Sequence, residues 1–241
     1  MSKMNKKRAT VLILAASLAS TVAIGGTLAY LTDTATKTNT IDVVTDLGVD
    51  VEEPEWTPDD NDDPLLPGDT KYKDPCITTT NDVFARLKIT FTDENNNQIT
   101  DSGKLTKIWQ TIKYDAGYDP DNPDGNQLKE GTSYSTEDIN ALSLSSTNTA
   151  NFVESGSANG TYYYYYKASD NNFVLAKDTT SPYLFTNIVI PSDWSNAHVD
   201  PALGGTGKFN IVIEVQAVQA ENQTATTLTA VENIFAAQTW S

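Results

Sequence analysis

The residues that could carry catalytic chemistry are few in this chain. Cys76 is the only cysteine and His198 the only histidine, and they lie far apart in sequence. A thiol or hydroxyl nucleophile needs a base within hydrogen-bond reach, and His198 stands in a polar loop, SNAHVDPALGG. Zinc proteolysis needs two histidines at helical spacing with a glutamate between them, which one histidine does not supply. Paired carboxylates for glycoside hydrolysis stay open in so acidic a chain, although no pair stands out. We therefore expect no enzyme, with no catalytic residue and no cofactor.

Two acidic segments raise the question of a metal. Residues 54–69 (PEWTPDDNDDPLLPGD) hold prolines and aspartates, and Asp119, Asp121 and Asp124 alternate with other residues in YDPDNPDG. Carboxylate oxygens are calcium ligands, but neither segment has the fixed alternation and glycine of a known calcium loop. Solvated acidic loops with no metal are the expectation, and a calcium site is the alternative left open.

The amino-terminal residues predict export. Lys3, Lys6, Lys7 and Arg8 precede an uncharged apolar stretch, residues 11–31, and Thr27-Leu28-Ala29 is a small-x-small cleavage site. We predict a signal peptide over residues 1–29, cut between Ala29 and Tyr30, and a secreted protein of the cell surface or extracellular matrix. The alternative is an uncleaved membrane anchor, because the apolar stretch is long enough to span a bilayer. The formal net charge of −16 makes a nucleic-acid partner improbable.

The segment that follows the cleavage site, residues 30–44, is extended in character. Threonines recur at every second position, and alternate positions of a strand share one face, so the segment forms a β-branched row with little apolar area. It needs a partner sheet to become ordered, which makes it a candidate donor strand for a neighbouring subunit. The predicted polymerisation residues are Tyr30, Leu31, Thr32, Thr34, Thr36, Thr38, Thr40, Ile41 and Val43.

The rest of the chain, residues 45–241, reads as a single β-sandwich domain. Alternating apolar residues predict strands over 83–92 and 208–220, with shorter strands at 49–51, 173–176 and 183–191. Apolar residues at helical spacing predict short helices over 105–112 and 226–235. The polar stretch 115–160 is expected to be loops with one helical turn over 136–142. Many short strands with few helices and long loops favour a mainly β, jelly-roll-like antiparallel sandwich.

Five consecutive tyrosines, Tyr162 to Tyr166, stand in one predicted strand. Alternation puts Tyr162, Tyr164 and Tyr166 on one side and Tyr163 and Tyr165 on the other, so the five rings cannot form one binding platform. We expect one face in the sandwich core and the other at the surface or under a neighbouring subunit.

Several stretches together resemble the TasA and camelysin group of exported Gram-positive proteins, whose signal peptides are removed by the peptidase SipW. The chain looks closest to clostridial members that include biofilm matrix pilins. The resemblance rests on GGTLAYLTDT (25–34), EEPEW (52–56), LPGDTKYKDPCITTTNDVFARLKI (66–89), YYYYK (163–167), SPYLFTNIVIP (181–191) and VIEVQAVQAEN (212–222).

This resemblance implies a jelly-roll subunit that polymerises with itself into extracellular fibres, the freed amino-terminal segment of one subunit entering the next as a strand. The signal peptidase is a partner during export, and the resemblance allows an accessory matrix subunit. Lys88 and Lys113, on or beside predicted strands, are candidates for isopeptide bonds between side chains, as in some extracellular pilins. The alternative function is a monomeric cell-surface adhesin or binding module.

Overall fold

A computed structural model gives the fold. It describes residues 32–38, 40–41, 47–56, 65–93, 95–121, 127–194, 209–221 and 223–240, the first two ranges as backbone only. The chain is mainly β, built from antiparallel sheets with a few short helices. No helix within these ranges is long and apolar enough to cross a membrane.

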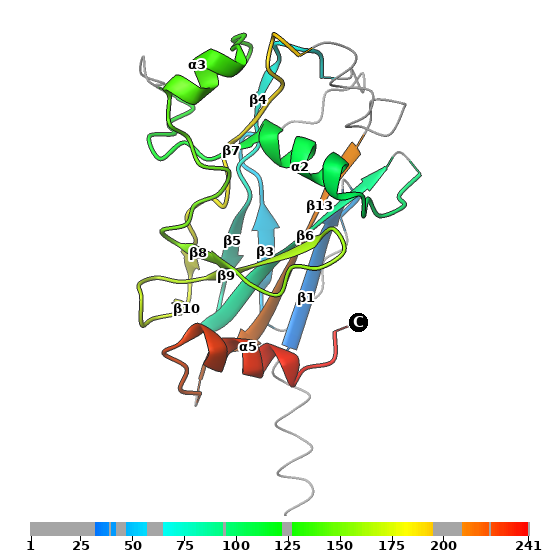
Figure 1. Cartoon of the computed structure of the whole chain (residues 1–241). Coiled ribbons are helices and arrows are strands. Elements are labelled where there is room, and N and C mark those ends of the chain that lie inside the picture. The colour runs from blue at the N-terminus through cyan, green and yellow to red at the C-terminus, as the bar shows by residue number, and fades with distance from the viewer. Residues whose placement is uncertain are drawn as a thin grey trace, which may run out of the picture.

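The largest sheet has seven strands. Its order is β2 (Thr40–Ile41), β1 (Thr32–Thr38), β13 (Phe209–Gln219), β6 (Val83–Asp93), β9 (Thr161–Tyr166) and β8 (Phe152–Glu154), and β10 (Val174–Leu175) also pairs with β6. The long strands β6 and β13 form its centre (Figure 1).

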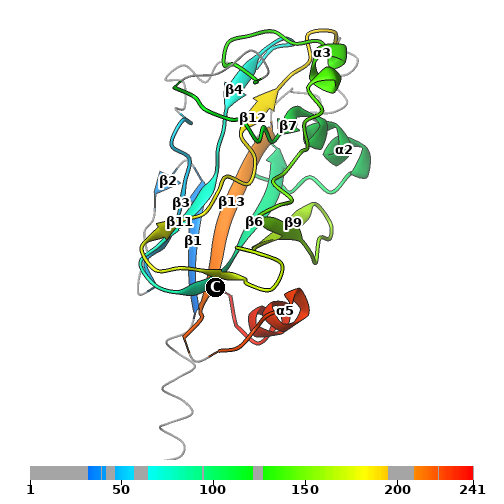
Figure 2. The ribbon, with the colours of Figure 1, turned by 90° about the vertical axis from the view of Figure 1, so that its left-hand side faces the viewer.

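Two sheets of three strands each complete the β structure. One has the order β11 (Thr179–Thr180), β5 (Cys76–Thr79) and β3 (Val49–Glu52), and the other β4 (Thr70–Tyr72), β12 (Asn187–Val189) and β7 (Ile112–Lys113). Val51, Ile77 and Ile188 of these small sheets share one buried core with Leu87 and Val215 of the large sheet. In the side view, β3 and β11 lie on one side of β13 and α5 on the other (Figure 2).

The alternating pattern of the two long strands is confirmed. Leu87, Ile89 and Phe91 of β6 are fully buried on one face, whereas Arg86 and Lys88 on the other face are only partly buried. The register places Ile213 of β13 opposite Ile89, so the apolar positions of the two strands share a face. This face carries the main core.

Three helices fall at the predicted positions: α2 (Ser102–Thr111), α3 (Thr136–Ala141) and α5 (Leu228–Ala236). Each begins at a residue whose side-chain oxygen accepts a hydrogen bond from a backbone N–H of the first turn, namely Asp101, Ser135 and Thr227. At α3 the carboxylate of Asp138 also accepts from the N–H of Ser135, which completes a capping box.

Some predicted boundaries are wrong. The stretch 115–160 contains strand β8, Phe152–Glu154, where only loops were expected, and the strand predicted over 183–191 is limited to Asn187–Val189. Alternation did not reveal β8, because three residues are too few to establish a period. From 184 to 191 the apolar residues are all buried, and burial alone does not separate a strand from a buried irregular segment.

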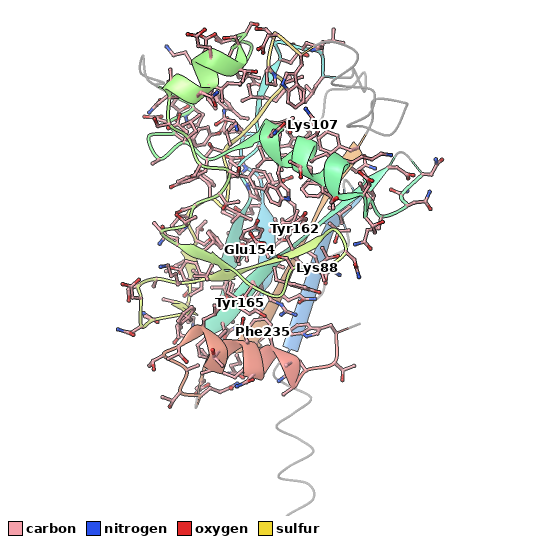
Figure 3. The ribbon with its side chains drawn as sticks, in the orientation of Figure 1. Lys88, Lys107, Glu154, Tyr162, Tyr165 and Phe235 are labelled. Atoms are coloured by element: carbon pink, nitrogen blue, oxygen red, sulfur yellow. The ribbon has the colours of Figure 1, made fainter. Side chains whose placement is uncertain are left out.

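The tyrosine strand β9 is buried on both faces at Tyr164, Tyr165 and Tyr166, whereas Tyr162 and Tyr163 are half-buried. Tyr164 and Tyr166 belong to the main core, which confirms the predicted alternation. Tyr165 belongs to a second core beneath α5, where its ring lies edge-on to Phe235 at 5.4 Å between centroids. The expectation that this second face lies at the surface or under a neighbouring subunit is wrong at Tyr165, because α5 of the same chain covers it (Figure 3). Tyr163 on the same face is half-buried.

Candidate functional site: the β1 edge

Strand β1 joins the large sheet near its edge. It pairs antiparallel with β13 on one side and on the other only with the two-residue strand β2 (Figure 1). Six residues, Thr32 to Lys37, face Val218 to Ile213 in register. Main-chain hydrogen bonds hold such a ladder, and they do not depend on which side chains the strand carries. The predicted polymerisation segment is therefore a strand, and its partner here is β13 of the same chain.

The register assigns the threonine row to one face of the sheet. Thr32, Thr34 and Thr36 stand opposite Val218, Gln216 and Glu214. Residues directly opposite each other belong to the same face, and Gln216 and Glu214 lie on the face away from the main core. The threonine positions therefore border the polar face of β13.

On that face, β13 and β6 carry a chain of polar contacts. Lys88 Nζ lies 2.9 Å from Glu214 Oε2, and Gln216 Nε2 donates to Glu214 Oε1 at 2.9 Å. Arg86 Nε donates to Gln216 Oε1 at 2.7 Å, and a second guanidinium nitrogen donates to the hydroxyl of Tyr165. These contacts hold the polar side chains of β13 against β6. Among the described strands, β1 is the one that pairs with the outer backbone edge of β13.

The opposite face of β13 is apolar. Ile213, Val215 and Ala217 are all buried in the main core. β13 thus remains fixed in the sheet by its own side chains whichever strand pairs with its edge. Without β1, most of an eleven-residue strand would present unpaired N–H and C=O groups, which is a template for strand addition.

The remaining predicted polymerisation residues are divided between two places. Thr38 ends β1, and Thr40 and Ile41 form β2. Ala29, Tyr30, Leu31 and Val43 lie outside the described residues, so the cleavage site stays a prediction.

The two candidate isopeptide lysines occupy different surroundings. Lys88 is ion-paired with Glu214 on the polar face of the large sheet. Lys113 ends β7, opposite Asn187 of β12, and burial lowers the pKa of its amine. Neither lysine lies on β1, and a covalent bond from either one stays a prediction.

The other candidates from the sequence have ordinary environments or lie outside the described residues. Cys76 is buried, and its thiol donates to the carbonyl of Glu52 at 3.6 Å. Asp119 and Asp121 are exposed, whereas His198 and Asp124 fall outside the described ranges. Within those ranges, no three His, Cys, Asp or Glu side chains converge as a metal ion would require.

Two of the blocks that carry the family resemblance meet in space. Lys73 and Glu53 form a buried ion pair at 2.7 Å, and the Lys73 ammonium lies 4.3 Å from the centroid of the Trp56 ring. Asp74 accepts from the backbone N–H of Glu55 at 3.2 Å, and its burial raises the pKa of the carboxyl group. The EEPEW and KDP sequences therefore form one structural cluster that ties the start of the domain to β4.

Sequence reasoning missed the polar partners on β13. Glu214 and Gln216 alternate with apolar residues in the sequence and look like solvent-facing strand positions, yet Gln216 is only 3% exposed. The signal that could have revealed them is the matching alternation of Arg86 and Lys88 on β6.

Comparisons with protein-family models, with curated proteins and with solved structures find no match to this chain.

Proposed function

We propose that this chain is a secreted structural subunit that polymerises into extracellular matrix fibres by exchange of its amino-terminal strand. The observation that carries the proposal is the pairing of β1, the first described strand, with the edge of β13. The sequence before β1 has the features of a cleavable signal peptide. Removal of that peptide frees the strand that exchanges.

The exchange follows from the geometry of the edge. β1 contributes a backbone ladder to β13, and a second copy of the chain offers the same ladder on its own β13. When β1 of one subunit replaces β1 of the next, the hydrogen bonds of the edge are preserved and the new contacts between domains stabilise the assembly. Because the donor strand and the acceptor edge are different surfaces, addition is head-to-tail and gives filaments.

The described sheets are compatible with a jelly-roll-like sandwich, which is the architecture that the family resemblance implies. The large sheet and the two small sheets enclose one core on the face of Leu87 and Val215. Before cleavage, the membrane-embedded signal peptide keeps β1 close to its own domain. We propose that pairing within the chain, as described above, is the state that precedes assembly.

Cysteine pairs across the ladder test the exchange. Thr36 stands opposite Glu214, so Cβ atoms at these positions lie within reach of a disulfide. One preparation carries Thr36→Cys and the other Glu214→Cys, both start at Tyr30, and the two are mixed in equal amounts, assembled and oxidised. Exchange between chains gives a disulfide-linked dimer on a non-reducing gel, because the two cysteines are then on different subunits.

Two controls sharpen this experiment. Asn210 is exposed on β13, four residues before Glu214, and is too distant for a bond to Thr36, so Asn210→Cys should give no dimer. The Thr36→Cys/Glu214→Cys double variant, kept as an unassembled monomer, should form the bond within one chain. Filaments of the mixed single variants that yield only monomer after oxidation would sink the exchange mechanism.

A further inference from the structure

A groove lies between α2 and β9, away from the β1 edge. It has a volume of about 480 Å³, which is in the range of small-ligand pockets. Thr106, Trp109 and Gln110 of α2 line one side, and Tyr162 of β9 and Lys113 of β7 line the other parts. Figure 3 shows Tyr162 below α2, and the ring of Tyr162 contacts that of Trp109 on this helix.

The aromatic part of the groove is rigid. The rings of Trp109 and Tyr162 meet edge-to-face with 5.0 Å between centroids, and the Phe91 ring lies 5.2 Å from Trp109. The indole N–H of Trp109 is buried and solvent-inaccessible, so it takes no part in binding a ligand. The ring contacts fix the aromatic wall of the groove in one geometry.

The polar part of the groove consists of neutral hydrogen-bonding groups. Thr106 and Gln110 follow each other at helical spacing on α2, and Ser146 lies beside them. All three are exposed. The Thr106 hydroxyl donates to the carbonyl of Ser102 at 2.8 Å, so its oxygen can still accept a hydrogen bond, and no hydrogen bond to the side-chain amide of Gln110 occurs within the described part of the chain. Hydroxyl and amide groups next to fixed aromatic rings suit a ligand that has both C–H faces and hydroxyl groups.

Among the described residues that line the groove, Lys113 is the only charged one. The chain has 32 acidic and 16 basic residues, yet no carboxylate is among the lining residues. Burial alone lowers the pKa of the Lys113 amine, and no carboxylate pairs with it among the described residues. A ligand carboxylate would supply the missing partner.

We propose that the groove between α2 and β9 binds an acidic sugar residue, a uronic acid within an extracellular polysaccharide. The sugar ring packs against Trp109 and Tyr162, its hydroxyl groups bond to Gln110 and Thr106, and its carboxylate meets Lys113. The site is separate from the β1 edge, so it does not depend on fibre assembly.

The test measures binding of a short oligogalacturonate to the chain that starts at Tyr30, by calorimetry and tryptophan fluorescence. We expect a Kd on the order of 0.1–1 mM, and tenfold or weaker binding of a neutral cello-oligosaccharide of equal length. Lys113→Gln should remove this preference for the acidic sugar. Thr106→Glu, at an exposed helix position, should abolish binding of the acidic sugar without affecting folding, because it adds a negative charge to the groove.

The matched control is Lys107→Gln, which removes a lysine from α2 that does not line the groove and whose ammonium lies near Trp194. Its affinity for the oligogalacturonate should equal that of the parent chain. An isopeptide bond at Lys113 would consume the amine that this proposal requires, and it would release ammonia from an asparagine partner or water from an aspartate partner. The intact mass of the purified chain should therefore show neither loss.

Four results would overturn the proposal. The first two are equal affinity for acidic and neutral sugars, and undiminished binding of oligogalacturonate by Lys113→Gln and Thr106→Glu. The other two are tighter binding of an acidic peptide such as oligoglutamate, and absence of any binding signal at millimolar oligogalacturonate. Filament formation by the groove variants, checked in parallel, keeps this outcome distinct from a failure of strand exchange.

Discussion

Strands β1 and β9 belong to the same sheet but are held in different ways. β9 lies between β6 and β8, and its tyrosines pack into a core on each face of the sheet. β1 lies between β13 and the two-residue β2, and its backbone register with β13 is its main attachment.

This difference separates a strand that builds the fold from one that can change partners. Side-chain packing is specific to its surroundings, so β9 cannot leave without disrupting two cores. A backbone ladder can be reproduced by any chain with the same edge. The conspicuous tyrosines are therefore structural, and the plain threonine segment is the better candidate for function.

The largest effect is expected when the ladder itself is broken. Thr34→Pro/Ala35→Pro should abolish filaments, because successive N–H groups of a strand point in opposite directions and one of the two lost donors faces β13. Electron microscopy of the chain that starts at Tyr30 checks this. Thr34→Val/Ala35→Thr keeps the donors and should still assemble. Filaments of normal length with the two prolines would remove the contrast between β1 and β9.

The second largest effect is expected beneath α5, where β9 is anchored. Phe235 is fully buried, packs edge-on to Tyr165 and stacks on Trp240 at 5.4 Å. Phe235→Ala should lower the free energy of unfolding by about 3–5 kcal/mol, since it removes a large side chain from a core that cannot collapse around the gap. Urea unfolding measures this loss. A loss below about 1 kcal/mol would mean that α5 is only loosely attached to the tyrosine strand.

A smaller effect is expected at Arg86, which joins the aromatic core beneath α5 to strand β13. Its guanidinium lies 4.3 Å from the Tyr163 ring and 4.6 Å from the Phe235 ring, and it also donates to Gln216 of β13. Arg86→Lys should cost about 1–2 kcal/mol, because an ammonium cannot stack on the rings and hold Gln216 at once.

Lys88 provides the comparison for Arg86 on the same face of β6. Its ion pair with Glu214 is partly exposed, so Lys88→Met should cost less than about 1 kcal/mol. Thermal and urea unfolding of both variants rank the two contacts. Equal losses of unfolding free energy in the two variants would show that the contacts between Arg86 and the aromatic rings do not stabilise the fold.

The elements of the fold were predictable where a period is long enough to read. β6, β13, α2 and α5 each follow from apolar residues at spacings of two or of three and four. The pairing partners were not predictable, because the ladder between Thr34 and Gln216 joins segments at opposite ends of the chain. Alternation states which residues share a face and gives no information on which strand comes to lie beside it.

The candidate site was predictable only in part. The threonine row identified β1 as a strand in need of a partner, and the structure supplies β13 as that partner within the same chain. The cover over Tyr165 was missed, because a helix near residue 235 cannot be assigned to one face of a distant sheet from its own periodicity. The groove beside Trp109 was missed because its lining comes from α2, β7 and β9, which only the tertiary fold brings together.

An effect as small as that of Lys88→Met is expected at neutral pH at the hydroxyl of Tyr164. Burial first, and then the nearby Glu154 carboxylate, raise the pKa of this phenol above its ordinary value near 10. A pKa that is raised in the folded state stabilises the fold while the phenol is protonated, and this contribution is lost as the pH rises above the unfolded value. Near neutral pH, Tyr164→Phe should therefore lower the free energy of unfolding by only about 0.5–1 kcal/mol, for the loss of the hydrogen bond to Glu154 Oε2.

At about pH 11 the variant should instead be more stable than the parent chain. Ionisation of the Tyr164 phenol then stabilises the unfolded state of the parent chain, and the variant lacks that phenol. Urea unfolding at both pH values measures this reversal, and an unchanged order would mean that Tyr164 ionises without leaving the core. Since ionisation acts on β9 and the ladder of β1 involves no phenol within the described residues, alkaline pH should weaken the domain before it weakens strand pairing at the edge.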